Sequence, residues 1–461
     1  MKVGILGSGP GGYVCAIRLA QLGADVTVIE DRHIGGVCLN KGCIPTKVML
    51  HSTELYDLLK RDSEALGIKH DGLKFDLGLL NTRKTLVISQ LVEGIRSLFK
   101  SYNIELINGR GKFLNEYEIE ITSPEGIKIL KFDKIVVATG SKPMKVQIEG
   151  INLENVLTSD DILKLNYVPD KMVIVGGGVI GVEFANIFAN LGTEVTIIEM
   201  LPNLVSNMDI EIVSYLEEKL SEKNVKVYKN AKVLEISKYG NELQTEIELR
   251  NEKIFINSNI VLIATGRSPN IDDLGLENIG INFTKRGIET DEVFKTNIEH
   301  IFAIGDCING IQLAHQASSA GIEVANYIFG NKSHIDFKTV PFCVYTKPEL
   351  ASVGITEEEA LKRKINYGVG KFNLYGNSKA VITGETSGLV KIIIDENTKE
   401  VLGMHIAGPN ATELIEIGGL ALKLEATANE LLSMIFAHPT ISESIREASM
   451  DAIGKAIHNI Y

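Results

Sequence analysis

Two cysteines five positions apart, Cys38 and Cys43, are the residues of this chain best suited to redox chemistry. On a regular helix their Cα atoms would lie about 8–9 Å apart, whereas a disulfide spans roughly 4.4–6.8 Å. The pair can therefore form a bridge only if Cys38 lies in a loop. Gly35, Gly36 and Gly42 supply the residues for such a loop.

Pro45 indicates where the helix after this loop begins, because proline is tolerated only in a helix's first turn. Cys43 would then lie at a helix N-terminus. The helix dipole and Lys47, one turn on, lower the pKa of a thiol there and favour the reactive thiolate. The alternatives are two buried structural cysteines, or a metal site, for which a full set of four ligands is missing.

A thiolate of this kind needs a base, and the segment around His438 offers one. His438 is followed by Pro439 and, five positions on, by Glu443. Imidazole titrates near neutrality, and a carboxylate partner fixes its tautomer and raises its pKa. The alternative is a structural His–Pro pair near the end of the chain.

The elements that would position this chemistry are repeated once. Residues 3–30 and 172–199 both read as a strand, a GxGxxG turn, a helix and a strand that ends in Glu, at an offset of 169 positions. This is the βαβ fingerprint of dinucleotide binding, in which a pyrophosphate faces a helix N-terminus. Two copies imply two dinucleotides, or one dinucleotide and a degenerate copy. The matched residues are Gly7, Gly9, Gly12 and Glu30 in the first unit and Gly176, Gly178, Gly181 and Glu199 in the second.

The acidic residue of the second unit predicts which nicotinamide cofactor is used. Glu199 would accept a hydrogen bond from a ribose 2′-hydroxyl and repel a 2′-phosphate. No Lys or Arg occurs between Glu199 and Lys219 to receive such a phosphate. NAD is therefore favoured over NADP.

The two units differ in length because the first carries an insertion. From the first glycine of the turn to the threonine of the later Ala-Thr-Gly segment, the first unit spans 132 residues and the second 89, a difference of 43. We place the insertion between positions 31 and 100, which includes both cysteines and a helical stretch over 48–60. From about residue 340, strands alternate with helices in an α+β pattern.

Composition excludes several classes of protein. The net charge of −12 disfavours nucleic acid as a partner. The chain shows no signal-peptide pattern and no run of 18 apolar residues, and its five cysteines do not form a secreted disulfide scaffold. Cys15, Cys307 and Cys343 stand alone. We expect a cytoplasmic protein with neither a membrane span nor a metal site.

Four segments together resemble class I of the pyridine nucleotide–disulfide oxidoreductase family, and the similarity covers essentially the whole chain. They are residues 35–47 (GGVCLNKGCIPTK), 305–306 (GD), 401–411 (VLGMHIAGPNA) and 438–443 (HPTISE). The resemblance implies an α/β fold with two Rossmann-like dinucleotide-binding domains plus a C-terminal α+β dimerisation domain. The expected segments are 1–143 (FAD binding, with the redox disulfide), 144–268 (NAD binding), 269–339 (the second part of the FAD-binding and central region) and 340–461 (dimerisation).

The resemblance also implies an activity. Protein-bound dihydrolipoamide would attack a Cys38–Cys43 disulfide through Cys38, His438 would take the proton, and Cys43 would pass the electrons through FAD to NAD⁺. The family forms homodimers in which the disulfide of one subunit meets the His438–Glu443 pair of the other. Lipoylated acyltransferase or lipoyl carrier proteins would be the partners, in 2-oxo acid dehydrogenase or glycine cleavage complexes.

The same resemblance assigns the cofactor contacts. Lys47 would lie near the flavin and pair with Glu183, and Val179 would cover the nicotinamide pocket. FAD would contact Gly7, Gly9, Gly12, Glu30, Lys47, Gly111, Thr139, Gly140, Ser141, Asp306, Gln312, Leu313, Ala314 and His315. NAD would contact Gly176, Gly178, Val179, Gly181, Glu183, Glu199, Val233 and Gly266.

Two alternative functions stay open on the sequence alone. One is another flavoprotein disulfide reductase, acting on glutathione or mercuric ion; Glu199 without a flanking Arg argues against it. The other is a flavin-containing scaffold without turnover, against which the intact cysteine and His–Glu sets argue. Two departures from the family pattern are Phe436, where a histidine is common, and Lys41, where a small apolar residue is common.

Overall fold

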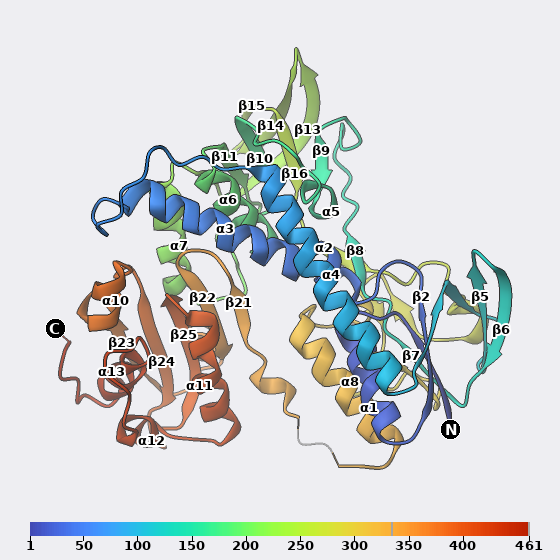
Figure 1. The fold of residues 1–461 in the computed structure, drawn as a ribbon. Coiled ribbons are helices and arrows are strands. Elements are labelled where there is room, and N and C mark those ends of the chain that lie inside the picture. Colours follow the sequence, from blue (N-terminus) through green and yellow to red (C-terminus); the bar gives the residue numbers. More distant parts are fainter. Residues whose placement is uncertain (333–334, 460–461) are drawn as a thin grey trace.

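The computed structural model describes residues 1–332 and 335–459 of the chain. Residues 333–334 and 460–461, which fall within the expected segments 269–339 and 340–461, lie outside the described residues. Three lobes are visible in Figure 1: the first parallel sheet at the lower right, the second sheet and its hairpins at the top, and the C-terminal lobe at the lower left. The fold is α/β, with two units built on parallel sheets and a C-terminal α+β unit.

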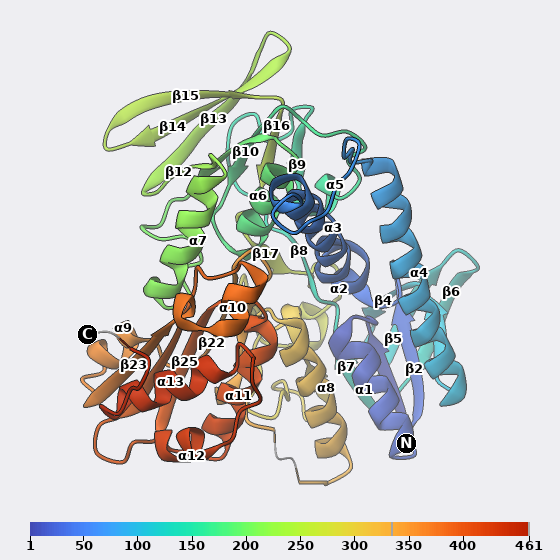
Figure 2. The same cartoon turned by 60° about the vertical axis from the view of Figure 1, so that its left-hand side comes forward.

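The first sheet is parallel and has the strand order β20-β7-β1-β2-β3. Four successive residues of its central strand are buried, as is typical of a parallel sheet covered on both faces. Residues after 300 return to this sheet as its edge strand, and the two helices α1 and α8 lie side by side against it (Figures 1 and 2). The elements are β1 (Lys2–Leu6), α1 (Pro10–Gln21), β2 (Asp25–Glu30), β3 (Glu105–Asn108), β7 (Lys134–Val137), β20 (Ile301–Ala303) and α8 (Ala314–Ile328).

The second sheet repeats the first, with the order β12-β11-β10-β16-β9. Strand β10 and helix α6 begin and end 169 residues after β1 and α1, so the repeat seen in the sequence is a repeat of structure. The elements are β9 (Val156–Thr158), α5 (Ser159–Ile162), β10 (Lys171–Val175), α6 (Val179–Asn190), β11 (Glu194–Ile198), α7 (Ile210–Glu222), β12 (Lys226–Tyr228) and β16 (Ile260–Ile263).

Each unit also carries a three-stranded antiparallel meander, which comes just before β7 in the first unit and just before β16 in the second. The first is β4 (Arg110–Phe113), β5 (Glu118–Ser123) and β6 (Gly126–Lys131); the second is β13 (Ala231–Tyr239), β14 (Glu242–Leu249) and β15 (Glu252–Ser258). The chain crosses between the units twice, and the two crossings pair as β8 (Ser141–Pro143) with β17 (Arg267–Pro269). Two short strands, β18 (Phe283–Thr284) and β19 (Gly287–Ile288), follow.

The insertion in the first unit lies between β2 and β3 and is helical, as expected. It contains α2 (Gly36–Lys41), α3 (Cys43–Asp62) and α4 (Leu77–Ser101). Helix α3 covers the helical stretch expected over 48–60 and packs against α6 of the second unit. The insertion therefore carries both cysteines to the junction of the two units (Figure 1).

The C-terminal lobe is an antiparallel five-stranded sheet with the order β21-β22-β25-β24-β23. Six successive residues of β24 are buried, and helices α11 and α13 pack against the sheet. The elements are β21 (Phe342–Val344), β22 (Glu349–Gly354), α9 (Glu357–Lys362), β23 (Tyr367–Asn373), α10 (Ser378–Thr383), β24 (Leu389–Asp395), β25 (Val401–Gly408), α11 (Ala411–Lys423), α12 (Ala428–Ser433) and α13 (Glu443–Ala452).

Within residues 1–332 and 335–459, no helix is both long enough and apolar enough to cross a membrane.

Candidate active site

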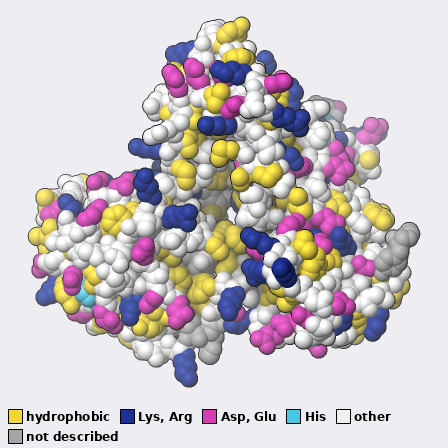
Figure 3. All heavy atoms as spheres, turned by 180° about the vertical axis from the view of Figure 1, so that it is seen from behind, with side chains coloured by type: hydrophobic (Ala, Val, Ile, Leu, Met, Phe, Trp, Pro, Cys, Tyr) yellow, Lys and Arg dark blue, Asp and Glu magenta, His cyan; other side chains and the backbone are white. Residues whose placement is uncertain are grey.

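A cavity of about 1470 Å³ lies where the units meet, and both glycine turns and the cysteine helix line it. Seen from behind, the surface is hollowed between the lobes and hydrophobic side chains gather there (Figure 3). The volume exceeds the roughly 300–1,000 Å³ of a single small-molecule pocket. Of the residues expected at the site, all line this cavity except Gly12, Gly181, His438 and Glu443.

The two glycine turns have the geometry that dinucleotide binding requires. Gly7 and Gly176 have φ of +102° and +109°, a conformation that side-chain-bearing residues rarely adopt. A Cβ on Gly12 or Gly181 would come within 2.1 or 2.0 Å of the carbonyl oxygen of the first glycine of its own turn. The absence of a side chain at Gly12 and Gly181 therefore lets each helix pack closely against the turn that precedes it. Helices α1 and α6 begin inside these motifs, at Pro10 and Val179. Neither helix has a side-chain cap, so N–H groups of its first turn are free to bind an anion.

The two acidic residues are held against their own glycine turns. Glu30 Oε2 accepts hydrogen bonds from Ser8 N (2.8 Å) and Ser8 Oγ (2.7 Å). Glu199 Oε2 accepts one from Gly177 N, at the equivalent position of the second turn (2.6 Å). Each carboxylate is thus fixed at the cavity wall, where a ribose could reach it.

One cation near the second acidic residue was missed in the sequence. The Ala231 N–H donates to the carbonyl oxygen of Glu199 (2.9 Å), and the next residue, Lys232, lines the cavity. Lys232 lies beyond Lys219, outside the stretch from which NAD was predicted. The backbone hydrogen bond of Ala231 brings it there from a position 33 residues later in the chain.

The side of the cavity lined by the first unit contains polar groups that fit a hydroxyl-rich ligand. Asp306 accepts a hydrogen bond from Ser141 Oγ (2.7 Å), and burial raises the pKa of this carboxyl against the opposing effects of Ser141 and Arg267. Thr139 Oγ1 is buried and has no hydrogen-bond partner among the described residues, and the same holds for Thr265 Oγ1 in the second unit. Bound dinucleotides would supply partners for these groups. Arg267, which donates to Ser141 Oγ (2.8 Å), was not found from the sequence.

The cysteine pair corrects one expectation. Cys38 lies in the short helix α2 and not in a loop. The helix is broken at Gly42, whose φ and ψ of −141° and −109° interrupt the rise between the cysteines and bring the two thiols into hydrogen-bonding contact. The expected start of α3 at Cys43 is confirmed.

Cys43 is the more acidic of the two thiols. The hydrogen bond from Cys38 lowers the pKa of Cys43 to about 7 despite burial, and the charge of Lys47 adds to the effect. The same contact, with burial, raises the pKa of Cys38. Lys47 Nζ lies 2.9 Å from both carboxylate oxygens of Glu183, which is only 3% exposed. The expected Lys47–Glu183 pair is therefore present, and it links the first unit to the second.

The C-terminal lobe contributes two further residues, Tyr345 and Cys343, to the part of the cavity around the Lys47–Glu183 pair. The Tyr345 N–H donates to Glu183 Oε1 (3.1 Å), and Lys47 Nζ lies 4.5 Å from the centre of the Tyr345 ring. Cys343 has no disulfide partner, but it also lines the cavity. Burial raises the pKa of Cys343 to about 12, which keeps it a thiol at neutral pH.

The His438–Glu443 pair forms as the spacing predicts, but away from the cysteines. His438 Nδ1 lies 3.0 Å from Glu443 Oε1 and 3.2 Å from Oε2. Burial opposes ionisation of Glu443, yet the Thr440 N–H and His438 hold the pKa of this carboxyl below its ordinary value. The His438 side chain is 68% exposed, and neither residue lines the cavity of its own chain. The imidazole of this pair is therefore accessible at the surface of the chain.

The two departures from the family pattern are both accommodated. Lys41 Nζ lies 3.7 Å from Asp160, so its charge is paired. Phe436 is partly buried against the core of the C-terminal lobe. The described residues contain no group of three or more His, Cys, Asp or Glu side chains placed to hold a metal ion.

Comparison with known proteins agrees with this geometry. Residues 1–321 match the pyridine nucleotide-disulphide oxidoreductase family, and residues 340–449 match its dimerisation domain. The chain belongs to this family. It is a flavoprotein disulfide oxidoreductase that uses FAD and NAD, and its dimerisation domain indicates a homodimer.

Among its relatives, the chain is 38% identical to the mitochondrial dihydrolipoyl dehydrogenase of Pisum sativum, over 98% of this chain and 92% of that protein. It is also 38% identical to a dihydrolipoyl dehydrogenase of Bacillus subtilis, over 99% of this chain and 100% of that protein. The crystal structure of LpdA from Mycobacterium tuberculosis superposes with a TM-score of 0.91 at 28% identity, covering 97% of this chain and 99% of that one.

The thiol assignment predicts different spectra for two serine variants. In Cys38→Ser holoenzyme the remaining Cys43 thiolate should give a long-wavelength absorbance with the oxidised flavin. The band should fade as the pH falls through the pKa that Cys43 has in this variant, because a thiolate is protonated below its pKa. Cys43→Ser should lack the band at every pH. Indistinguishable visible spectra for the two variants would show that the assignment is wrong.

Proposed function

We propose that this protein oxidises dihydrolipoamide carried on lipoylated proteins and reduces NAD⁺ to NADH, through FAD and a Cys38–Cys43 disulfide. One observation carries the proposal. The cysteine pair, with an acidic Cys43 beside the Lys47–Glu183 pair, lies in one cavity between two glycine turns that each fit a dinucleotide. The names of the two relatives at 38% identity support this choice of substrate.

The chemistry of the thiols follows from their pKa values. A substrate thiolate attacks the sulfur of Cys38, a mixed disulfide forms, and Cys43 leaves as a thiolate. A thiol of lower pKa leaves faster, which suits Cys43 as the leaving group. The second substrate thiol then displaces Cys38 and closes the lipoyl disulfide. When bound, FAD accepts the electron pair and NAD⁺ accepts a hydride.

The role of His438 is to take the proton from the incoming dithiol, with Glu443 orienting the imidazole. Because neither residue lines the cavity of its own chain, we propose that they act on the disulfide of the other subunit. Exposed hydrophobic side chains on the C-terminal lobe, among them Val381, Leu420 and Ile435, support burial of this surface in a dimer.

The remaining assignments belong to the same proposal. Segments 1–143 and 269–339 hold FAD, segment 144–268 holds NAD, and segment 340–461 forms the dimer. The contacts are those expected from the sequence, and the cavity lining supports all of them except Gly12 and Gly181. A cytoplasmic location suits a dithiol that must be reduced in each cycle, although the name of the pea relative places that protein in mitochondria.

The partner assignment can be tested by affinity capture from a native lysate of the source cells. The dimer should retain acyltransferases or carrier proteins that carry lipoyl groups, detected with an antibody to lipoyl-lysine. Lysate from cells unable to attach lipoate is the control. Capture of the same proteins whether or not they are lipoylated would contradict lipoyl recognition.

Glu199 provides a prediction about the cofactor. A hydrogen bond to a charged group is worth about 1.5–3 kcal/mol, so Glu199→Ala should weaken the use of NADH roughly 10- to 100-fold. The use of NADPH should hold or improve, because the repulsion of a 2′-phosphate is removed and Lys232 remains in the cavity. Steady-state kinetics with both cofactors measures this. Equal use of NADH and NADPH by the unmodified enzyme would contradict the argument.

A further inference from the structure

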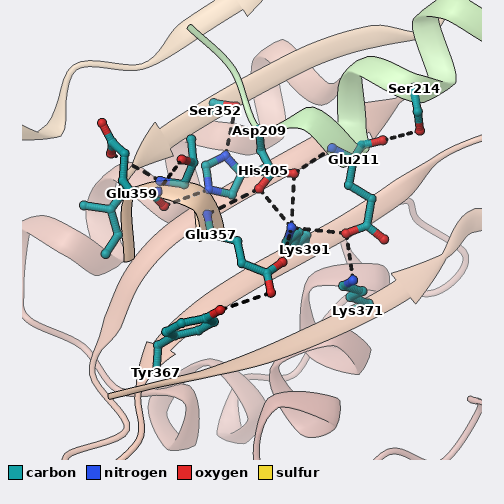
Figure 4. A network of polar contacts seen from close by, with 12 residues as sticks. Asp209, Glu211, Ser214, Ser352, Glu357, Glu359, Tyr367, Lys371, Lys391 and His405 are labelled. Atoms are coloured by element: carbon teal, nitrogen blue, oxygen red, sulfur yellow. Dashed lines mark hydrogen bonds and ion pairs between the residues drawn. The ribbon is translucent and has the colours of Figure 1, made fainter. Parts of the chain in front are cut away.

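A lysine of the C-terminal lobe is buried among three carboxylates that come from two different lobes. Lys391, in β24, is 1% exposed. Its Nζ lies 2.9 Å from Asp209, 3.1 Å from Glu211 and 2.7 Å from Glu357 (Figure 4). Burial opposes the charge of this amine, but the carboxylates outweigh burial and raise the pKa of Lys391. The lysine is therefore a fixed cation.

The innermost of these carboxylates belongs to the NAD-binding unit. Asp209 is fully buried, and it caps α7 by accepting a hydrogen bond from Glu211 N (3.0 Å). Burial would raise the pKa of Asp209, but His405 and Lys391 lower it, so the residue is a carboxylate. Both of these partners belong to the C-terminal sheet (Figure 4). The place of Asp209 is thus set by residues more than 180 positions later in the chain.

Asp209 ends the segment that forms one wall of the NAD half of the cavity. Residues 200–208 run from Glu199 to Asp209, and most of them line the cavity. The Val205 N–H donates to the carbonyl oxygen of Gly177 in the second glycine turn (3.0 Å). At its start the segment is held by the Leu201 N–H, which donates to Glu199 Oε1 (2.7 Å). The segment therefore touches both groups expected to bind NAD.

The backbone of this segment is strained at its middle. Val205 has φ of +42° and is 2% exposed. A β-branched residue in this region of the backbone is costly, and such a conformation persists only where the surroundings impose it. Glu199 fixes the position of one end of the segment, and the Lys391–Asp209 pair fixes the position of the other.

We propose that Lys391 is a positioning residue for NAD. By fixing Asp209, it holds residues 200–208 against the second glycine turn, so that the C-terminal lobe shapes the NAD site from outside it. This inference rests on the assignment of the second glycine turn to NAD. It makes NAD affinity depend on a residue that is not expected to touch NAD.

The test is the binding of ADP-ribose to oxidised, FAD-loaded enzyme, measured by calorimetry. Asp209→Asn keeps the shape of the residue and its helix cap but removes the charge that Lys391 holds. We expect binding about tenfold weaker, the effect of losing roughly one charge-assisted hydrogen bond. Reduction of the flavin by dihydrolipoamide, which does not need NAD, should stay at the unmodified rate. A general loss of structure would lower both.

Lys371→Met is the matched control. Lys371 pairs with Glu211 (2.7 Å) in the same network but is 39% exposed and has no ion pair with Asp209 (Figure 4). This variant should bind ADP-ribose as the unmodified enzyme does. If Asp209→Asn yields no FAD-loaded dimer, Lys391→Arg takes its place, because it keeps the charge and shifts the contact. It should weaken ADP-ribose binding and spare the dihydrolipoamide half-reaction.

Two failures can be told apart by including Glu199→Ala. If this variant binds ADP-ribose as tightly as the unmodified enzyme, the NAD site itself is misplaced and the proposed function loses its second dinucleotide site. If Glu199→Ala weakens binding while the tested variant at Asp209 or Lys391 binds normally, the positioning role alone is overturned.

Discussion

Replacing His438 with alanine should slow the reduction of the enzyme by dihydrolipoamide about 10²–10⁴-fold, the range typical of a lost general base. Reduction of the flavin by NADH should be nearly unchanged, because no dithiol is deprotonated in that step. Glu443→Gln should show a milder form of the same asymmetry, since it orients the imidazole through a 3.0 Å contact and transfers no proton itself. Rapid-mixing measurement of each half-reaction separates the two.

The chain offers a matched control for this variant. His458 Nδ1 lies 2.9 Å from Glu447, one turn further along α13, and its side chain is 67% exposed, close to the 68% of His438. His458→Ala removes the same kind of pair and should slow the dihydrolipoamide step far less. The base assignment is wrong if the two variants behave alike, or if His438→Ala slows both half-reactions equally.

Activity should return when two inactive variants are combined in one dimer. Cys38→Ser and His438→Ala homodimers should each oxidise dihydrolipoamide poorly, because every site lacks one required group. In the heterodimer both lesions fall in one site, and the other site has an intact disulfide and an intact base. With one of two equivalent sites restored, the heterodimer should reach about half the unmodified turnover.

This experiment needs heterodimers purified with two different affinity tags, and the separately purified homodimers serve as controls. It tests the arrangement that the position of His438 implies, outside the cavity of its own chain. A heterodimer as inactive as the His438→Ala homodimer would mean that the disulfide and the base of one chain work together.

The parts of the site that sequence could predict are those fixed by local backbone chemistry. The glycine turns were found because Gly7 needs a positive φ and Gly12 leaves no room for a side chain. The start of α3 at Cys43 followed from Pro45, and the His438–Glu443 contact followed from a spacing of five residues. The exact repeat of β1 and α1 in β10 and α6 made the two-unit fold visible in the sequence.

The parts that were missed depend on contacts between distant segments. Tyr345 reaches Glu183 from 162 positions away, and Cys343 enters the cavity on the same strand–loop connection. Lys391 gave no signal, because a single lysine in an apolar strand does not reveal which carboxylates will surround it. Cys38 was predicted to lie in a loop because a continuous helix would hold the two cysteines too far apart for a disulfide. A break at Gly42 between two helices also shortens the distance between them.

The most direct test of the proposed function is the turnover of purified, FAD-loaded dimer with defined substrates. NADH formation from NAD⁺ and dihydrolipoamide should be rapid, should be lost in Cys38→Ser, and should be far slower with NADP⁺. Reduction of glutathione disulfide by NADPH should be negligible under the same conditions. A preparation that reduces glutathione disulfide with NADPH faster than it oxidises dihydrolipoamide with NAD⁺ would contradict the account.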